Sequence, residues 1–550
     1  MAQAPLRIGD LLVAKGLLSK KQLNIALIQQ RVTGAILGET LISLGFLTAP
    51  EFARTIAKQF GLEYLELRSV TIADETLRFV PKEVAKKNGY IPLALHEGTL
   101  SIGVTNPSNI VALDSARNLT GKSPRVYLVD QDSYNDIMES AYYFVEHPVH
   151  RRLEELNSGF RNGGVVPGAI VPELTELLLM DGIRRQATDI HFTPSKEVLH
   201  VFYRIDGVLT YGHCLPGAFQ SSLVSRIKIM AQMDIAEQRL PQDGSYTLAF
   251  LSKKYDLRIS TVPSIHGEIV VIRVLSTSGS LMRINTLGFS DTLVATMRRL
   301  FAKSHGIVLI TGPTGSGKTT TLYSYLREID LLERNVITVE DPVEYRLNFV
   351  RQTEVNEKAG YTFASSARSF MRQDPDVMLL GEIRDSETAQ IAIRASITGH
   401  LVLSTLHTND AVTAIPRLLD LGMDKLLLSS SLLAVMAQRL ARRICHRCKE
   451  EYDLDVVDQA LFSKAGITIT RAFRGAGCDS CDGGGYAGRT CIAEVMIVTG
   501  EIREMIFAGA STGAIFKTAL KGGMIPLYVD GLRKAAAGET TLQEVQRVAG

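Results

Sequence analysis

A glycine-rich segment between an apolar run and a polar helix-like run is the part of the sequence best suited to chemistry. The segment GPTGSGKT begins at Gly312, and the apolar run Ile307–Thr311 before it predicts a buried strand. Its glycines let backbone N–H groups curl around phosphate oxygens, and the N-terminus of a following helix adds positive potential. Lys318 can reach the β- and γ-phosphates, and the Thr319 hydroxyl can ligate Mg²⁺. A chance glycine loop is the alternative. The predicted nucleotide-binding residues are Gly312, Pro313, Thr314, Gly315, Ser316, Gly317, Lys318, Thr319 and Thr320.

Carboxylates and histidines follow the next predicted strands. VITVEDPVEY ends a strand at Glu340, and DPDVMLLGEIRD presents Glu382 beyond a second strand. GHLVLSTLHTND contains a third strand, bracketed by His400 and His407. Carboxylates at the ends of neighbouring strands in such a sheet lie beside the phosphates, where they can hold Mg²⁺ or polarise water. For either histidine alone, an ordinary core or surface role is the alternative.

Four of the six cysteines form two CxxC pairs separated by 29 residues. Each pair can place two thiolates on one knuckle, and two knuckles close a tetrahedral site suited to Zn²⁺. Four thiolates leave no open coordination position, so the predicted role is structural. A redox pair or free thiols are the alternative. The predicted ligands are Cys445, Cys448, Cys478 and Cys481.

The elements around these residues suggest several α/β segments. Beyond Ile284, apolar strands alternate with helices, which is typical of a largely parallel sheet. Strands are predicted at 199–205 and 268–275 in a second α/β unit, and at 100–104 in a mixed region before it. The glycine-rich residues 156–169 predict a flexible linker.

The first sixty residues contain an internal repeat at an offset of 29. RIGDLLVAKGLL, starting at Arg7, aligns with ILGETLISLGFL, starting at Ile36. A short helix, a glycine stop and a second amphipathic helix would explain this spacing. Two copies are too few for a solenoid, so the repeat predicts a pseudo-symmetric helical pair.

Composition restricts the environment of the protein. Sixty basic and 58 acidic residues give a net charge of +2, so no global field attracts nucleic acid or an anionic membrane. No apolar stretch is long enough to span a bilayer, and the N-terminus lacks the apolar run of a signal peptide. We therefore expect a cytoplasmic protein that does not bind nucleic acid.

In their order along the chain and in their residues, these motifs resemble the Walker A, aspartate-box, Walker B and histidine-box set of the secretion ATPase superfamily. The nearest branch is the assembly ATPases of type II secretion and type IV pili (the GspE/PilB type), and the resemblance covers roughly residues 173 to 545. It implies that Glu340 orients the attacking water, that Glu382 supports Mg²⁺ and water, and that His407 senses the γ-phosphate.

The segments ATDIHF, YRIDGVL and LRISTVPSIHGEIVVIRVL resemble the second N-terminal domain of the same family. The resemblance implies that Arg258 and Arg273 reach the phosphates of an adjacent subunit, as arginine fingers do. Surface salt bridges are the alternative. The family usually has PQDGR where this chain has PQDGS, so Ser245 stands in place of the last arginine of that motif.

The cysteine segments resemble the zinc-binding insertion of the family, and Cys491 stands where a glycine is usual, which we interpret as packing. The repeat resembles an N-terminal domain that binds cyclic di-GMP in some pilus extension ATPases. Ile36 and Asn106 depart from that domain's pattern, and a degenerate module that only docks to a membrane partner is the alternative. The matching residues are Arg7, Gly9, Leu11, Leu12 and Gln30 in the first motif, and Gly38, Leu41 and Gln59 in the second.

The fold class that follows is α/β, with a RecA-like P-loop ATPase core preceded by a PAS-like α/β domain and an N-terminal α/β regulatory domain with a helical repeat. We predict an N-terminal domain at 1–145, a flexible linker at 146–172, the PAS-like domain at 173–283, and the ATPase domain at 284–550. The zinc insertion would occupy about 440–492 of the ATPase domain.

The predicted function is an ATP-hydrolysing motor that assembles a type IV pilus or a type II secretion pseudopilus. The resemblance implies a homo-hexamer at the cytoplasmic face of the inner membrane, working with an inner-membrane platform protein and associated cytoplasmic-ring components. ATP, Mg²⁺ and Zn²⁺ are the predicted cofactors, with cyclic di-GMP as a possible effector. The alternatives are a nucleotide- and cyclic-di-GMP-responsive signalling switch, a retraction or conjugation motor, and a nucleic-acid translocase.

Overall fold

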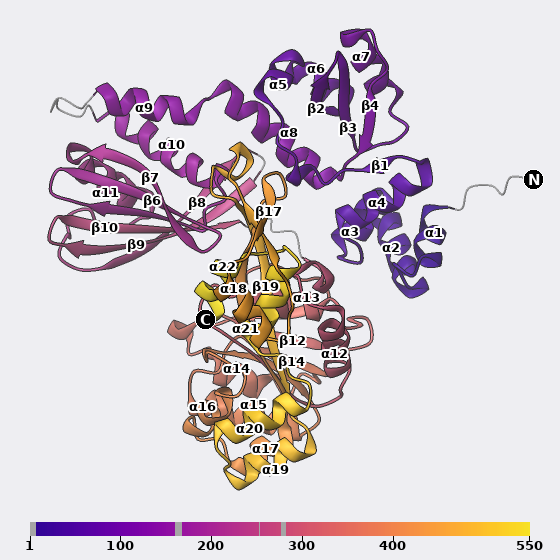
Figure 1. The fold of residues 1–550 in the computed structure, drawn as a ribbon, viewed down its shortest axis with the longest axis vertical. Helices are drawn as coiled ribbons and strands as arrows, with labels where there is room; N and C mark the ends of the chain where they lie inside the picture. Colours follow the sequence, from indigo (N-terminus) through magenta and orange to yellow (C-terminus); the bar gives the residue numbers. More distant parts are fainter. Residues whose placement is uncertain (1–6, 160–167, 252, 277–281) are drawn as a thin grey trace, which may run out of the picture. The chain divides into compact units, whose positions relative to one another are not determined.

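A computed structural model describes residues 7–159, 168–251, 253–276 and 282–550 (Figure 1). The chain divides into two compact units, Met1–Gly279 and Ser280–Gly550. Each unit has its own clusters of buried apolar side chains.

Four helices at the start of the first unit repeat a short–long pattern. The two long helices begin with the same capping box, in which Ser19 and Thr48 each accept a backbone N–H three residues on. Gly16 and Gly45 follow the two short helices in left-handed conformations, with φ of 68° and 74°. The structure therefore confirms the predicted repeat. The helices are α1 (Ile8–Ala14), α2 (Lys20–Thr33), α3 (Leu37–Ser43) and α4 (Ala49–Phe60).

A small mixed sheet follows the repeat, with strand order β1-β4-β3-β2. Strands β3 and β4 are parallel, whereas β2 and β3 form an antiparallel pair. The predicted strand at 100–104 lies within β3. The elements are β1 (Glu63–Tyr64), α5 (Asp74–Phe79), α6 (Lys82–Asn88), β2 (Tyr90–His96), β3 (Thr99–Val104), α7 (Ile110–Thr120), β4 (Arg125–Leu128) and α8 (Gln131–Glu146).

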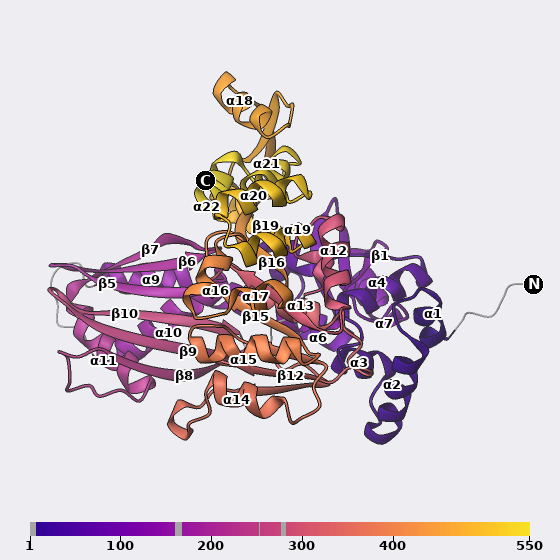
Figure 2. The same ribbon diagram turned by 90° about the horizontal axis from the view of Figure 1, so that it is seen from below.

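A six-stranded sheet in the order β7-β6-β5-β10-β9-β8 completes the first unit, and all its neighbouring pairs are antiparallel (Figure 2). Alternate residues are buried in one cluster with residues of helices α10 and α11. Charged residues fill many of the positions between them. The elements are α10 (Ile170–Arg184), β5 (Asp189–Pro194), β6 (Val198–Ile205), β7 (Val208–Pro216), α11 (Gln220–Met230), β8 (Gln242–Phe250), β9 (Lys253–Ser264) and β10 (Gly267–Ser276).

Helix α9 (Val149–Gly159) occupies part of the segment predicted as a flexible linker, so that prediction is wrong for these residues. Val149, Leu153 and Leu156 are buried in the cluster beneath the six-stranded sheet. Their i, i+4, i+7 spacing gives the helix one apolar face, which outweighs the polar residues between them. The glycine-rich residues 160–167 lie outside the described residues.

The second unit is built on a seven-stranded sheet in the order β13-β12-β14-β15-β11-β16-β19. All neighbouring pairs are parallel except β16 and β19. Two apolar clusters draw on these strands and on the helices around them. Strands were predicted before the glycine loop and before each of Glu340, Glu382 and His407, and the structure confirms these four strands. The strands are β11 (Gly306–Thr311), β12 (Val336–Glu340), β13 (Val350–Glu354), β14 (Val377–Leu380), β15 (Leu401–Leu406), β16 (Leu432–Ile444) and β19 (Tyr486–Ile497).

Ten helices of the second unit surround or follow this sheet within residues 282–550. They are α12 (Asp291–Phe301), α13 (Lys318–Leu326), α14 (Phe363–Phe370), α15 (Ser386–Ile397), α16 (Ala414–Asp420), α17 (Lys425–Ser431), α19 (Gly500–Ala508), α20 (Thr512–Lys521), α21 (Leu527–Ala536) and α22 (Leu542–Ala549).

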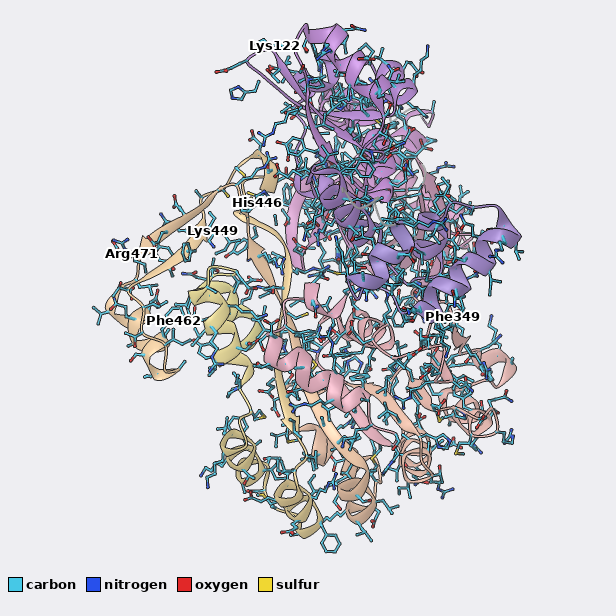
Figure 3. All side chains as sticks on the ribbon, turned by 90° about the vertical axis from the view of Figure 1, so that its right-hand side faces the viewer. Lys122, Phe349, His446, Lys449, Phe462 and Arg471 are labelled. Atoms are coloured by element: carbon cyan, nitrogen blue, oxygen red, sulfur yellow. The ribbon has the colours of Figure 1, made fainter. Side chains whose placement is uncertain are left out.

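A small hairpin lies between β16 and β19. It consists of β17 (Lys449–Asp453) and β18 (Arg471–Gly475), joined through helix α18 (Val456–Lys464). Figure 3 labels Lys449 and Arg471 on its two strands. Among the described residues, no helix is both long and apolar enough to cross a membrane.

Candidate nucleotide site, metal centre and arginine row

The glycine loop joins β11 directly to helix α13. Gly312, Gly315 and Gly317 have φ values of 150°, 78° and 85°, which side-chain-bearing residues rarely adopt. The Ser316 hydroxyl is buried and has no hydrogen-bond partner among the described residues. The loop therefore has the backbone freedom and the unused donor that a phosphate cradle requires.

Lys318 begins α13, and its ammonium donates to the carbonyl oxygens of Gly312 and Pro313 at 2.8 and 3.1 Å. Burial lowers the pKa of Lys318 to about 8, because the charged form loses hydration, although the nearby Glu382 carboxylate favours the charged form. The predicted magnesium ligand, Thr319, is exposed on the first turn.

Glu382 and His407 come together at the ends of β14 and β15. The His407 Nε2 atom lies 3.3 Å from one Glu382 carboxylate oxygen, and the Arg384 guanidinium lies 2.5 Å from the other. The oxygen facing His407 is buried without a hydrogen-bond partner in the described part of the chain. With Lys318 interacting electrostatically with Glu382, three predicted residues share one site.

The loop that carries His407 is tied to the strand before the glycine loop. The Thr408 N–H donates to the Thr311 hydroxyl at 2.7 Å, and the two hydroxyls lie 2.8 Å apart. His400, by contrast, bonds the Ala395 carbonyl at the end of α15, which is an ordinary structural contact. Of these two histidines, His407 is the one that lies beside Glu382.

Glu340 is the last residue of β12 and is 4% exposed. The Tyr323 hydroxyl donates to one carboxylate oxygen, and Thr338 and Gln352 donate to the other at 2.6 and 3.2 Å. Burial beside this carboxylate raises the pKa of Tyr323. The three donors were missed by sequence reasoning. Thr338 shares a strand face with Glu340 and could have been found, whereas nothing in the sequence marks Gln352.

These groups form what we call the nucleotide edge: the glycine loop and the carboxyl ends of β11, β12, β14 and β15. Because the strands are parallel, their carboxyl ends meet at one side of the sheet. The arrangement can bind a phosphate chain on backbone N–H groups and Lys318, and it places carboxylates within reach of a divalent cation or a water molecule.

The four predicted zinc ligands are brought together at the base of the hairpin. Their sulfur atoms all lie within 4.8 Å of one another. Three of the Sγ–Sγ distances are 3.8, 3.8 and 3.7 Å, close to the edge of about 3.8 Å that a tetrahedron with Zn–S bonds of about 2.3 Å requires. The donor set therefore fits a structural Zn²⁺.

A row of polar residues crosses five strands of the six-stranded sheet. Ser245 on β8 faces Arg258 on β9, and Arg258 faces Arg273 on β10. Arg273 faces Asp189 on β5, which in turn faces Arg204 on β6. We call this set the arginine row. A cavity of about 640 Å³ is lined by Ser245, both predicted arginines, Asp189 and neighbouring residues.

Carboxylates hold the arginines of this row. Arg273 lies 3.1 Å from Asp189, and Arg258 lies 3.7 Å from Asp256. Both arginine side chains remain about half exposed. The predicted arginines therefore share one cavity and keep guanidinium surface available to an anion.

The predicted cyclic-di-GMP residues divide into buried and accessible ones. Leu12 and Leu41 are completely buried, so packing accounts for them and a ligand cannot touch them in this conformation. Gly9 and Gly38 are also packing positions, since an added Cβ would lie 2.9 Å from Leu23 and 2.4 Å from Phe52. The remaining predicted residues, Arg7, Leu11, Gln30 and Gln59, are exposed or half-buried.

Comparison with known proteins decides the family. The family model described as "Type II/IV secretion system protein" matches residues 167–547, which is more than half of the chain. The chain belongs to this family. A second model, the MshEN domain, matches residues 60–146, a span that begins at the last residue of α4.

Relatives in this family are named for both type IV pili and type II secretion. The "Type IV pilus assembly ATPase PilB" of Myxococcus xanthus is 38% identical, covering 98% of each chain. The "Type II secretion system ATPase E" of Vibrio cholerae is 45% identical over 69% of this chain and 75% of its own. The predicted resemblance to the assembly ATPases is confirmed.

A solved structure also shares the fold of part of this chain. The crystal structure of the Legionella pneumophila ATPase DotB is similar at a TM-score of 0.50 and 19% identity, over 68% of this chain and 95% of its own. Together with the sheets and helices described above, this likeness confirms the predicted α/β fold class.

Proposed function

We propose that this protein hydrolyses ATP as a homo-hexameric motor and so powers assembly of a type IV pilus or a type II secretion pseudopilus. It would act at the cytoplasmic face of the inner membrane through a platform protein and associated cytoplasmic-ring components. The observation that carries the proposal is the convergence of Lys318, Glu382 and His407 at one sheet edge, beside a glycine loop that leads into a helix.

The residues of the nucleotide edge take distinct roles in this proposal. Backbone N–H groups of the loop and Lys318 bind the phosphates. Thr319 would hold Mg²⁺, which would neutralise phosphate charge. Glu340 is a general base for the attacking water, fixed by its buried donors. Glu382 supports the cation and water, and His407 detects the γ-phosphate.

Arg258 and Arg273 act on the nucleotide of a neighbouring copy. Their half-exposed guanidinium groups can neutralise charge that develops on the transferred phosphoryl group. Cys445, Cys448, Cys478 and Cys481 would hold Zn²⁺ at the base of the hairpin, in a structural role with no part in hydrolysis. Cyclic di-GMP acts as an effector at the N-terminal domain.

Phosphate release by the full-length protein with Mg²⁺-ATP tests this proposal. We expect slow turnover that falls at least 100-fold in Lys318→Ala and in Glu382→Gln, with both variants remaining oligomeric. Wild-type turnover in both variants would contradict the assigned site. A protein that binds ATP and oligomerises yet never turns over would favour the signalling switch.

Cyclic di-GMP titrated into the same assay tests the N-terminal domain separately. A rise in turnover supports an effector site, and Arg7→Ala should abolish that rise without changing basal turnover. Turnover indifferent to the dinucleotide, together with no retention on immobilised cyclic di-GMP, would contradict the effector role and leave the ATPase standing.

A further inference from the structure

Gln438 on β16 lies directly beneath the glycine loop. The register of the parallel pair places Ala437 opposite Thr311, the last residue of β11, so the next residue of β16 stands beside Gly312. The Gln438 side chain is completely buried. A buried amide in an otherwise apolar strand is costly unless its hydrogen bonds are satisfied.

Each polar atom of this amide has a partner. The Gln438 Nε2 donates to the Ser316 carbonyl oxygen at 2.7 Å and approaches the Cys491 sulfur at 3.4 Å. The Gln438 Oε1 accepts from the Thr321 hydroxyl on α13 at 2.8 Å. One side chain therefore joins the loop, the helix that follows it, and strand β19.

The bond to Ser316 fixes the orientation of one peptide in the loop. In a planar trans peptide the N–H points opposite to the C=O. Because Gln438 holds the Ser316 carbonyl on its own side, the Gly317 N–H must point to the other side of the loop. A flipped peptide would turn a carbonyl dipole to that side in place of a donor.

The same residue restricts which side chains the loop can carry. A Cβ added at Gly312 would lie 2.5 Å from the Gln438 carbonyl oxygen, and one at Gly317 would lie 2.9 Å from the Gln438 Nε2. Both glycines are therefore required by close approach as well as by their positive φ.

We propose that Gln438 is the positioning residue of the nucleotide loop, and that it aims the Gly317 N–H at the phosphate chain through its bond to Ser316. Thr321 is its second anchor and fixes the rotation of the amide. The inference rests on the proposal above that this loop binds the phosphates of ATP.

Equilibrium binding of the fluorescent analogue mant-ATP to the full-length protein tests the proposal. Gln438→Met keeps the length and burial of the side chain but removes both polar groups. We expect its Kd for mant-ATP to rise about tenfold, which corresponds to about 1.4 kcal/mol. A Kd within twofold of wild type overturns the proposal.

A matched control separates positioning from loss of stability. Met436 lies two residues earlier on the same strand, is equally buried, and contacts no loop residue through a hydrogen bond that the structure describes. Met436→Ala should lower Tm through a cavity while its mant-ATP Kd stays within twofold of wild type. An equal rise of Kd in this variant overturns the proposal, because the effect would then follow stability alone.

A second pair of variants applies even where Gln438→Met does not fold. Thr321→Val removes only the hydroxyl and should raise the mant-ATP Kd about threefold, whereas Thr321→Ser keeps the donor and restores tight binding. Equal affinities of the two variants overturn the proposal. Lys318→Ala serves as the reference: wild-type affinity in that variant would refute the nucleotide loop itself, a result that differs from failure at Gln438 alone.

Discussion

The nucleotide edge and the arginine row hold charged groups in opposite ways. Glu340 is nearly inaccessible and is fixed by three neutral donors that come from two strands and a helix. Arg258 and Arg273 stand on an antiparallel sheet, are about half exposed, and form ion pairs with carboxylates. Buried groups with neutral partners keep one geometry, whereas exposed ion pairs exchange partners readily.

This difference suggests a division of labour. The nucleotide edge is built before the nucleotide arrives, which suits binding and orientation. The arginine row can release its carboxylates and take a phosphate instead, which suits a group that acts only when another subunit approaches. Variants of the two regions should therefore differ in whether they change kcat or the Kd for nucleotide.

The largest difference between the change in kcat and the change in Kd is expected from the arginine variants. Arg258→Ala and Arg273→Ala should each lower kcat about 100- to 1000-fold while the mant-ATP Kd of the protein changes less than threefold, because the guanidinium acts on charge that develops during transfer. Steady-state phosphate release and fluorescence titration measure the two quantities.

Oligomers that contain subunits of two different variants give the control for this prediction. Arg258→Ala subunits retain an intact nucleotide edge, and Lys318→Ala subunits retain an intact arginine row. If the arginine acts across a subunit interface, mixed oligomers regain part of the activity that each variant lacks. No recovery in co-assembled oligomers would place the arginine's action within its own chain or make it purely structural.

The pH dependence of binding should come from the nucleotide edge alone. The pKa of Lys318 is lowered to about 8 by burial, so the ammonium is charged below that pH and neutral above it. We expect the mant-ATP Kd to be constant below about pH 7.5 and to rise about tenfold by pH 9. Lys318→Arg stays charged throughout and should bind with a flat profile over this range. A wild-type profile as flat as that of the arginine variant would contradict the assignment.

Removal of a single buried donor should affect the chemical step. Tyr323→Phe deletes the hydroxyl that donates to Glu340 but keeps the ring in place. Loss of one hydrogen bond to a charged group predicts a fall in kcat of about tenfold with an unchanged Kd. Thr353→Ser, which keeps the bond from its hydroxyl to the Thr338 carbonyl on the same pair of strands, is the matched control and should change kcat less than twofold.

The smallest effect is expected where the family arginine is missing. Ser245 faces Arg258 across the sheet, and Asp243 and Asp256 line the same cavity. Ser245→Arg restores a third guanidinium that these carboxylates can accommodate, so we expect kcat to rise two- to threefold. Ser245→Lys gives the matched charge without the planar fork and should raise kcat less. A decrease in both variants would show that repulsion by Arg258 dominates.

Much of this molecule could be predicted from the sequence, because its signals are local. The glycine spacing from Gly312 to Gly317, the two CxxC pairs and the offset of 29 in the first sixty residues each reflect short-range requirements of backbone or metal geometry. The strands before the loop and before Glu340 are short apolar runs of the kind that a buried parallel sheet requires.

Helix α9 was not predicted, because the glycine-rich residues after it are typical of a linker and its own apolar spacing covers only three positions. The burial of Leu12 and Leu41 was also not predicted, since one leucine in an amphipathic helix can serve a core or a ligand equally well. Local pattern does not distinguish these outcomes; only the neighbours in space do.

The sequence by itself determined the glycine loop, the two cysteine pairs, the order of the polar groups that follow successive strands, and the family. Only the tertiary structure decided which polar residues support them. Gln438 reaches Ser316 from 122 positions away along the chain, and Arg273 reaches Asp189 from 84 positions away. Such contacts depend on strand order and register, which join residues without any fixed spacing in sequence, whereas a loop or a knuckle is fixed by the few residues that form it.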